Sequence, residues 1–113
     1  MKKMIYHATP YENLQSIMQH GLKPSAFGET YFANKSDYAA GFAKLYSGST
    51  KFKIVVLPVD ASLLDESKLS VGVDHAPMFF PDDLEVTVYA DLIPSVLIDL
   101  DKALVFDIDE SVE

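Results

Sequence analysis

The spacing of hydrophobic residues changes from strand-like to helix-like within the first 20 positions of the chain. An apolar run over residues 4–7 predicts a first strand, which ends at His7. Beyond it, apolar residues recur every three or four positions and predict a helix whose buried face comprises Leu14, Ile17 and Met18. The chain is therefore expected to begin with a strand that leads directly into a helix.

Both ends of this predicted helix carry boundary residues. Thr9 is the expected N-cap, Pro10 fits the first helical position, and Glu12 completes a capping box. Gly21 is the expected left-handed C-cap, and Pro24 prevents the helix from resuming. Together these residues predict a helix that starts immediately after Thr9.

The middle of the chain predicts a second helix between two strands. A brief strand at residues 29–33 precedes a helix that Asn34 or Ser36 can cap. The β-branched run over residues 51–59 is typical of an internal strand, and Pro58 is tolerated there because it lies near the end of the run.

Beyond residue 60 the pattern alternates between irregular and strand-like. Residues 60–83 predict a long loop, because glycine, proline and aspartate interrupt the apolar runs there. Further strands are predicted at residues 85–90, 96–100 and 103–108. In the last of these, alternation with aspartates predicts a core-facing set of Leu104, Phe106 and Ile108. Since strands and helices are segregated along the chain, the predicted class is α+β with a mostly antiparallel sheet.

The composition predicts one compact domain over residues 1–113, with a frayed tail at residues 110–113. Hydrophobic residues make up 49% of the chain and charged residues 23%, which is ordinary for a globular protein. No apolar run approaches the roughly 20 residues of a membrane helix, and the one after Lys2 and Lys3 is too short for a secretion signal. The absence of cysteine excludes disulfides and thiolate catalysis. We therefore expect a cytoplasmic protein.

Charge is distributed unevenly along the chain. Residues 1–53 carry seven lysines against three acidic residues, whereas residues 54–113 carry two lysines against fourteen, and the net charge is −8. The first half can attract an anionic ligand, and the acidic second half would repel a nucleic-acid backbone. The chain contains no arginine, which is the usual bidentate ligand of phosphate.

Few residue types in the sequence suggest chemistry by themselves. His7 stands at a strand tip next to a helix start, a place suited to a phosphorylated ligand, although histidines at strand ends more often have structural roles. His20 fits a helix C-terminus and His75 a loop, and no histidine has the spacing of a metal ligand. Tyr31 would by default be a core aromatic, and Glu85 an exposed strand residue. There is no G-x-G-x-x-G segment and no P-loop, so neither of those nucleotide-binding sites is supported.

Three separated segments nevertheless resemble one superfamily. Residues 6–9 (YHAT), residues 28–33 (GETYFA) and residues 85–89 (EVTVY) occur in the order of the three motif strands of ADP-ribosyltransferases of the poly(ADP-ribose) polymerase or diphtheria-toxin type. The helix expected after His7 also resembles the helix that follows the first motif. Each segment is short, but their order and placement agree over nearly the whole chain.

The resemblance implies two small, roughly orthogonal, mostly antiparallel sheets that form a cleft for NAD, together with two helices. It implies that His7 hydrogen-bonds the adenosine ribose, with Thr9 as part of the same motif, and that the Ala8 backbone holds the nicotinamide amide. Tyr31 would stack on the nicotinamide ring. Glu85 would bind the 2′-hydroxyl of the nicotinamide ribose and stabilise the transition state, in which positive charge develops on the sugar.

Other parts of the family pattern are matched less closely. Tyr38 and Phe42 are both candidates for closing the second face of the nicotinamide site. The loop before Glu85, where the superfamily recognises its acceptor, offers His75, Met78 and Phe79. The absence of arginine excludes the branch whose motif begins with that residue. It also counts against RNA 2′-phosphotransferases and against DNA-modifying toxins.

These observations predict an NAD-dependent mono-ADP-ribosyltransferase that moves ADP-ribose to an acceptor and releases nicotinamide. NAD would be a co-substrate, no metal is needed, and the acceptor would be a protein or small molecule rather than nucleic acid. One alternative is a catalytically silent module on the same fold that binds NAD, ADP-ribose or a partner. Another is an interaction protein that displays the apolar residues 78–80.

Overall fold

The described residues of this protein form a sheet of six strands in the order β4-β5-β2-β1-β3-β6, all antiparallel to their neighbours. The computed structural model describes residues 3–24, 28–47, 51–71 and 83–109. The strands are β1 (Met4–Pro10), β2 (Thr30–Ala33), β3 (Lys51–Asp60), β4 (Leu69–Val71), β5 (Val86–Tyr89) and β6 (Leu104–Asp109). The α-helices in the described residues are α1 (Leu14–His20) and α2 (Ser36–Ser47). Short 3-10 turns are η1 (Tyr11–Asn13), η2 (Ala61–Leu63), η3 (Glu66–Lys68), η5 (Ser95–Leu97) and η6 (Leu100–Lys102).

The α+β class is confirmed, but the predicted division into two sheets is wrong. β4, β5 and β2 form one half, and β1, β3 and β6 form the other. The halves join because β1 and β2 pair at one position, where Tyr6 lies opposite Ala33. The described strands therefore form a single sheet with a narrow joint between its halves.

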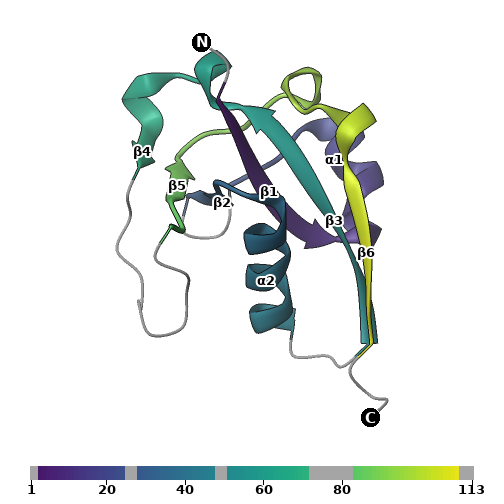
Figure 1. Cartoon of the computed structure of the whole chain (residues 1–113). Helices are drawn as coiled ribbons and strands as arrows, with labels where there is room; N and C mark the ends of the chain where they lie inside the picture. Colours follow the sequence, from purple (N-terminus) through teal and green to yellow (C-terminus); the bar gives the residue numbers. More distant parts are fainter. Residues whose placement is uncertain (1–2, 25–27, 48–50, 72–82, 110–113) are drawn as a thin grey trace.

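The two faces of the sheet carry separate apolar clusters, and α1 and α2 cover opposite faces (Figure 1). Ile5 and Phe32 are fully buried and pack with Ile17 of α1. On the other face, Ala33 and its neighbours pack with Ala39 of α2. Because side chains alternate along a strand, each position can be assigned to the α1 face or the α2 face.

The start of the first helix differs from the prediction. β1 does not stop at His7 but continues until Thr9 and Pro10 pair with Val55 and Ile54 of β3. Thr9 is therefore a strand residue and not an N-cap, and its buried hydroxyl accepts a hydrogen bond from Asn13 Nδ2 at 3.1 Å. The turn η1 follows, and α1 begins only at Leu14.

The apolar face and the end of α1 agree with the prediction in part. Ile17 is buried and Leu14 packs at the margin of the core, whereas Met18 is 50% exposed, so its predicted burial is wrong. Gly21 ends the helix with a φ of 82°, but its ψ of 176° lies outside the left-handed helical region, so the predicted left-handed C-cap is wrong in its conformation. None of the helices in the described ranges is long and apolar enough to span a membrane.

In the described part of the C-terminal half, one predicted strand is absent and one strand that was not predicted, β4, is present. β3 is internal, between β1 and β6, as its β-branched sequence indicates. The expected strand at 96–100 is instead the pair of turns η5 and η6. This segment is linked to β3 by a bridge between Ile98 and Val59 and by a hydrogen bond from Asp99 N to Pro58 O, at the end of β3 that β6 does not reach.

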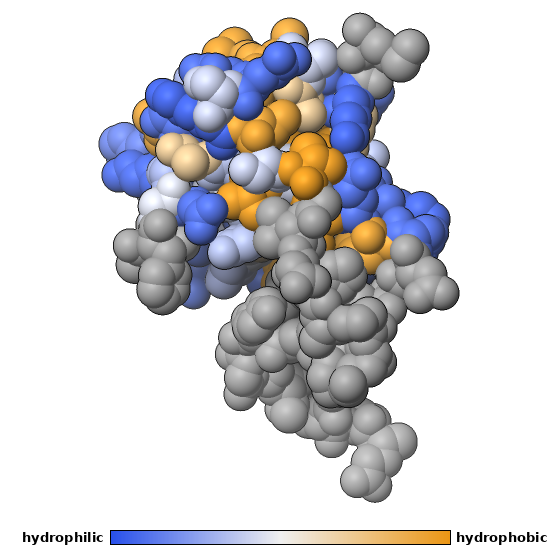
Figure 2. Space-filling view, turned by 90° about the vertical axis from the view of Figure 1, so that its left-hand side faces the viewer, coloured by the Kyte–Doolittle hydropathy of each residue, from blue (hydrophilic) through white to orange (hydrophobic). Residues whose placement is uncertain are grey.

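The predicted loop at 60–83 is partly structured. Its first part contains η2, η3 and β4, and residues 72–82, which include His75, Met78 and Phe79, lie outside the described residues. The β4 side of the molecule shows apolar side chains interspersed among hydrophilic ones (Figure 2). Leu63 and Val71 are exposed apolar residues of this part of the chain.

Candidate functional site

The three segments that carry the resemblance lie on three adjacent strands. Residues 6–9 belong to β1, residues 30–33 to β2, and Glu85 directly precedes β5; these strands are neighbours in the order β5-β2-β1. Positions that are distant in sequence are therefore close across the sheet. Which face each side chain occupies decides what they can bind together.

His7 lies on the α1 face at the joint between the two halves of the sheet. Its Nδ1 is 2.8 Å from the Tyr31 carbonyl oxygen, and its ring centroid is 5.6 Å from that of Phe32. A carbonyl only accepts hydrogen bonds, so Nδ1 must carry the proton. In the neutral ring this leaves Nε2 as an acceptor, which can bind a hydroxyl donor.

Burial of the imidazole lowers the pKa of His7 below its ordinary value of 6.5. The hydrogen bond to the Tyr31 carbonyl opposes this shift, because it favours the protonated ring, but the loss of hydration is the larger effect. His7 is consequently neutral at pH 7. It can act there as a hydrogen-bond acceptor and not as a cation for phosphate.

This pKa shift predicts a pH dependence of stability. Because the folded-state pKa lies below the unfolded value of 6.5, the unfolded chain binds more protons in the interval between the two. The contribution of His7 should be complete above pH 6.5 and should decline as the pH falls through that interval. Urea unfolding from pH 8 to pH 5 should show a smaller decline for His7→Gln than for the native chain. Equal declines would contradict the prediction.

Tyr31 lies on the opposite face from His7. In β2 it pairs with Val88 and alternates with the buried Phe32, so its side chain is on the α2 face, where it is 46% exposed. Ala8 lies on the same face, at the edge of the apolar cluster there. The main chain of Tyr31 contacts His7, but its aromatic ring does not lie beside the imidazole.

Glu85 lies on the α1 face, as His7 does. Its backbone N–H donates to Asn34 Oδ1 at 3.0 Å, and its carbonyl accepts from Asn34 N at 3.1 Å. Its carboxylate pairs with Lys3 Nζ at 2.9 Å, and both side chains remain about half exposed. Strand spacing places the Cα atoms of His7 and Glu85 about 12 Å apart, so only a ligand that extends between them could contact both.

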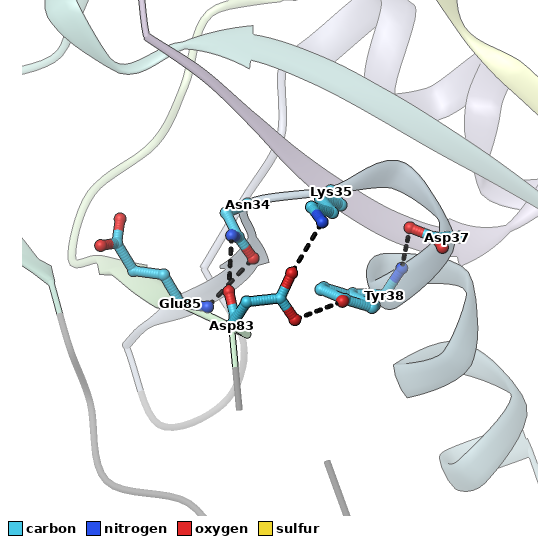
Figure 3. Close-up of polar contacts among 6 residues, drawn as sticks. All are labelled: Asn34, Lys35, Asp37, Tyr38, Asp83 and Glu85. Atoms are coloured by element: carbon cyan, nitrogen blue, oxygen red, sulfur yellow. Dashed lines mark hydrogen bonds and ion pairs between the residues drawn. The ribbon is translucent and has the colours of Figure 1, made fainter. Parts of the chain in front are cut away.

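The side-chain amide of Asn34 hydrogen-bonds the main chain at Asp83 and at Glu85, on either side of Leu84 (Figure 3). Its amide Nδ2 donates to the Asp83 carbonyl at 2.9 Å, while its Oδ1 accepts from Glu85 N. The sequence offers Asn34 as a possible cap of the second helix, but its side chain instead binds the main chain next to the neighbouring strand β5. It holds the backbone of Glu85 against the start of α2.

The Asp83 carboxylate adds a second link to α2 (Figure 3). It accepts from Lys35 Nζ at 2.7 Å and from the Tyr38 hydroxyl at 2.5 Å. These hydrogen bonds lower the pKa of Asp83, and they raise the pKa of Lys35 and of Tyr38. Lys35 and Asp83 are solvent-exposed, and Tyr38 is partly buried against the α2-face cluster. Exposed ion pairs contribute little to stability, so the Lys35–Asp83 pair orients the residues before Glu85 more than it stabilises the fold.

Of the two candidates for closing the nicotinamide site, the structure describes the side chain of Tyr38 but not that of Phe42. Tyr38 hydrogen-bonds Asp83, and Lys35 Nζ lies 5.3 Å from its ring centroid. Phe42 belongs to α2, but its side chain is outside the described residues. In the part of the chain that is described, no group of three or more histidine, aspartate or glutamate residues could hold a metal ion.

Sequence reasoning missed the residues that hold Glu85. Lys3, Lys35 and Asp83 have no distinctive local context. Asn34 was recognised only as one possible helix cap. Their partners are 48 to 82 residues away in the chain, so no spacing rule could have paired them. No known family model matches this sequence, and no curated protein matches it either.

Proposed function

We propose that the protein binds NAD and transfers ADP-ribose from it to an acceptor, with release of nicotinamide. The observation that carries the proposal is the placement of the three resembling segments on adjacent strands, although 18 and 51 residues separate them in the sequence. A coincidental set of three short motifs has no reason to assemble in this way.

The chemistry assigns separate tasks to the residues. The bond between the nicotinamide nitrogen and C1′ of the ribose breaks, and its electron pair leaves with nicotinamide. Positive charge then develops on the sugar, where a carboxylate such as Glu85 is stabilising. The acceptor forms a bond to C1′ and loses a proton. Glu85 must exchange its ion pair with Lys3 for a ribose hydroxyl when NAD binds.

The neutral state of His7 supports its proposed role. An unprotonated Nε2 accepts a hydrogen bond from a ribose hydroxyl, as the resemblance requires. Ala8, Tyr31 and Tyr38 are on the α2 side, so the nicotinamide would bind there. His7 and Glu85 are on the α1 face, so one ligand could contact both sets of residues only by passing the sheet at the joint between β1 and β2, where a single position is paired.

The alternative is a module that binds NAD or ADP-ribose without turnover. Two observations favour it. The Glu85 carboxylate is held by Lys3, and the Tyr31 ring lies on the other face of the sheet from Glu85. A protein that kept the ligand site but lost catalysis could retain both features.

The test is the exchange of Glu85 for glutamine, which keeps the shape of the side chain but removes its charge. Nicotinamide release, measured by chromatography, should fall by about 100-fold or more, while NAD binding by calorimetry stays within about threefold. Glu66→Gln, an equivalent change at an exposed site in η3, should leave both unchanged.

The outcomes separate the two functions. Binding of NAD without nicotinamide release by the native chain would favour the silent module. Undiminished turnover in Glu85→Gln would show that Glu85 has no catalytic role. No heat with NAD or with ADP-ribose would reject both functions.

A further inference from the structure

β6 forms one edge of the sheet and is long enough to pair with another chain. It pairs with β3 over six positions, from Lys51 opposite Asp109 to Val56 opposite Leu104. Among the described residues, no strand pairs with its other side. Such an edge presents a row of N–H and C=O groups that an added strand can use. The opposite edge, β4, is only three residues long and offers little for pairing.

β6 lacks most features that protect an edge strand. Its sequence, LVFDID, contains no proline and no lysine. Leu104 is 45% exposed and Val105 is 50% exposed, and alternation places them on opposite faces of the sheet. An apolar side chain is thus left uncovered on each face, where one further strand would cover both.

The two faces of β6 have different chemistry. Leu104 and Phe106 are on the α2 face, whereas Val105 and Asp107 are on the α1 face. β3, which pairs with the inner side of β6, is complementary to these two faces. On the α1 face, Lys53 lies opposite Asp107, with Nζ at 3.8 Å from the carboxylate. Ile54 lies opposite Phe106. The matching segment of β3 reads KFKI, in which lysine and apolar residues alternate.

We propose that the outer edge of β6 binds an extended segment of a partner protein in which lysines alternate with apolar residues. Apolar side chains of the segment would cover Leu104 and Phe106 on the α2 face, and its lysines would meet Asp107 on the other face. The described residues 99–109 contain four acidic residues and one lysine, so the surroundings of the edge attract a basic segment. A second copy of the chain fits poorly, since each copy carries the same aspartates and a net charge of −8.

The experiment uses the whole chain and fluorescein-labelled peptides in an anisotropy titration. The probe is an acetylated peptide of sequence KFKIKVK, which repeats the pattern of β3. One control, KKKFIVK, has the same composition without the alternation, and another, EFEIEVE, reverses the charge. The probe should bind about tenfold or more tightly than either control, because only its lysines and apolar residues fall on the correct faces.

Variants of the chain locate the binding. Asp107→Lys, at a side chain that is 78% exposed, should weaken probe binding about tenfold or more without unfolding the protein. Glu66→Lys makes the same charge change in η3, away from β6, and should alter the affinity by less than about threefold.

Four results would overturn the inference. Equal affinity for KFKIKVK and KKKFIVK would mean that charge alone attracts the peptide. Unchanged binding by Asp107→Lys would place the peptide elsewhere, and absence of binding would reject the docking site. A dimer in light scattering that Asp107→Lys dissociates or tightens would assign the edge to a second copy.

Discussion

Replacing Phe32 with alanine is expected to lower the free energy of unfolding by about 3–5 kcal/mol. Phe32 is fully buried at the centre of the α1-face cluster, where Ile5, Ile17 and Leu57 belong to the same core. Truncation removes the transfer free energy of the ring and leaves a cavity that the sheet cannot fill without moving its strands. Domains of this size are stable by only about 5–15 kcal/mol, so the variant should be close to unfolding.

Urea denaturation followed by circular dichroism measures this loss. Leu63→Ala serves as the matched control, because Leu63 is 59% exposed and its truncation should change the free energy by less than about 0.5 kcal/mol. Phe32→Leu should fall between the two, since it keeps most of the buried volume. A loss below about 1 kcal/mol for Phe32→Ala would mean that the ring is not packed as described.

The same substitution tests the link between the core and the candidate site. Phe32 contacts the His7 ring and helps to exclude water from it. In Phe32→Leu, which should remain folded, the pKa of His7 measured by nuclear magnetic resonance should move back toward 6.5. The neutral His7 that the proposed function uses is therefore a consequence of core packing as well as of the Tyr31 carbonyl.

Local patterns predicted most elements but failed where a distant strand decided the conformation. The β-branched run of β3 is a local signal, and its prediction as an internal strand is confirmed. The glycine at the end of α1 is also a local signal, and it ends the helix, although not in the predicted left-handed conformation. The capping box at Thr9 is also a local signal, but pairing of Thr9 and Pro10 with β3, more than 40 residues later, overrides it. The pairing of these two residues with β3 outweighs an N-cap, which contributes about 1 kcal/mol.

The candidate site could be predicted only as a set of residues. Alternation within β1 or within β2 shows which residues share a face of that strand, but only the register of Tyr6 with Ala33 relates the two strands. This register puts His7 and Tyr31 on opposite faces. The clamp of Asn34 on Asp83 and Glu85 also depends on long-range pairing, of β2 with β5, which no local pattern encodes.

Gly21→Ala is expected to destabilise the protein by about 3 kcal/mol or more, for two reasons that act together. Gly21 has a φ of 82° and a ψ of 176°, a region that is essentially restricted to glycine. An added Cβ would lie 2.6 Å from the Ile93 carbonyl oxygen, which is a backbone atom and cannot rotate away. That carbonyl accepts from Leu22 N at 2.8 Å, so relieving the clash would break the bridge that holds the end of α1 to the segment after β5.

Two other glycines distinguish the effect of backbone strain from that of the steric clash. Gly28 has a φ of 80° but no atom within 4 Å of an added Cβ, so Gly28→Ala should cost only the backbone strain of about 1 kcal/mol. Gly41 lies inside α2 with open space around it, and Gly41→Ala should stabilise the protein by about 0.5–1 kcal/mol. Thermal unfolding of the three variants should therefore lower the melting temperature strongly at Gly21, slightly at Gly28, and raise it at Gly41. Equal destabilisation by Gly21→Ala and Gly28→Ala would mean that the backbone of Ile93 does not lie as close to Gly21 as described.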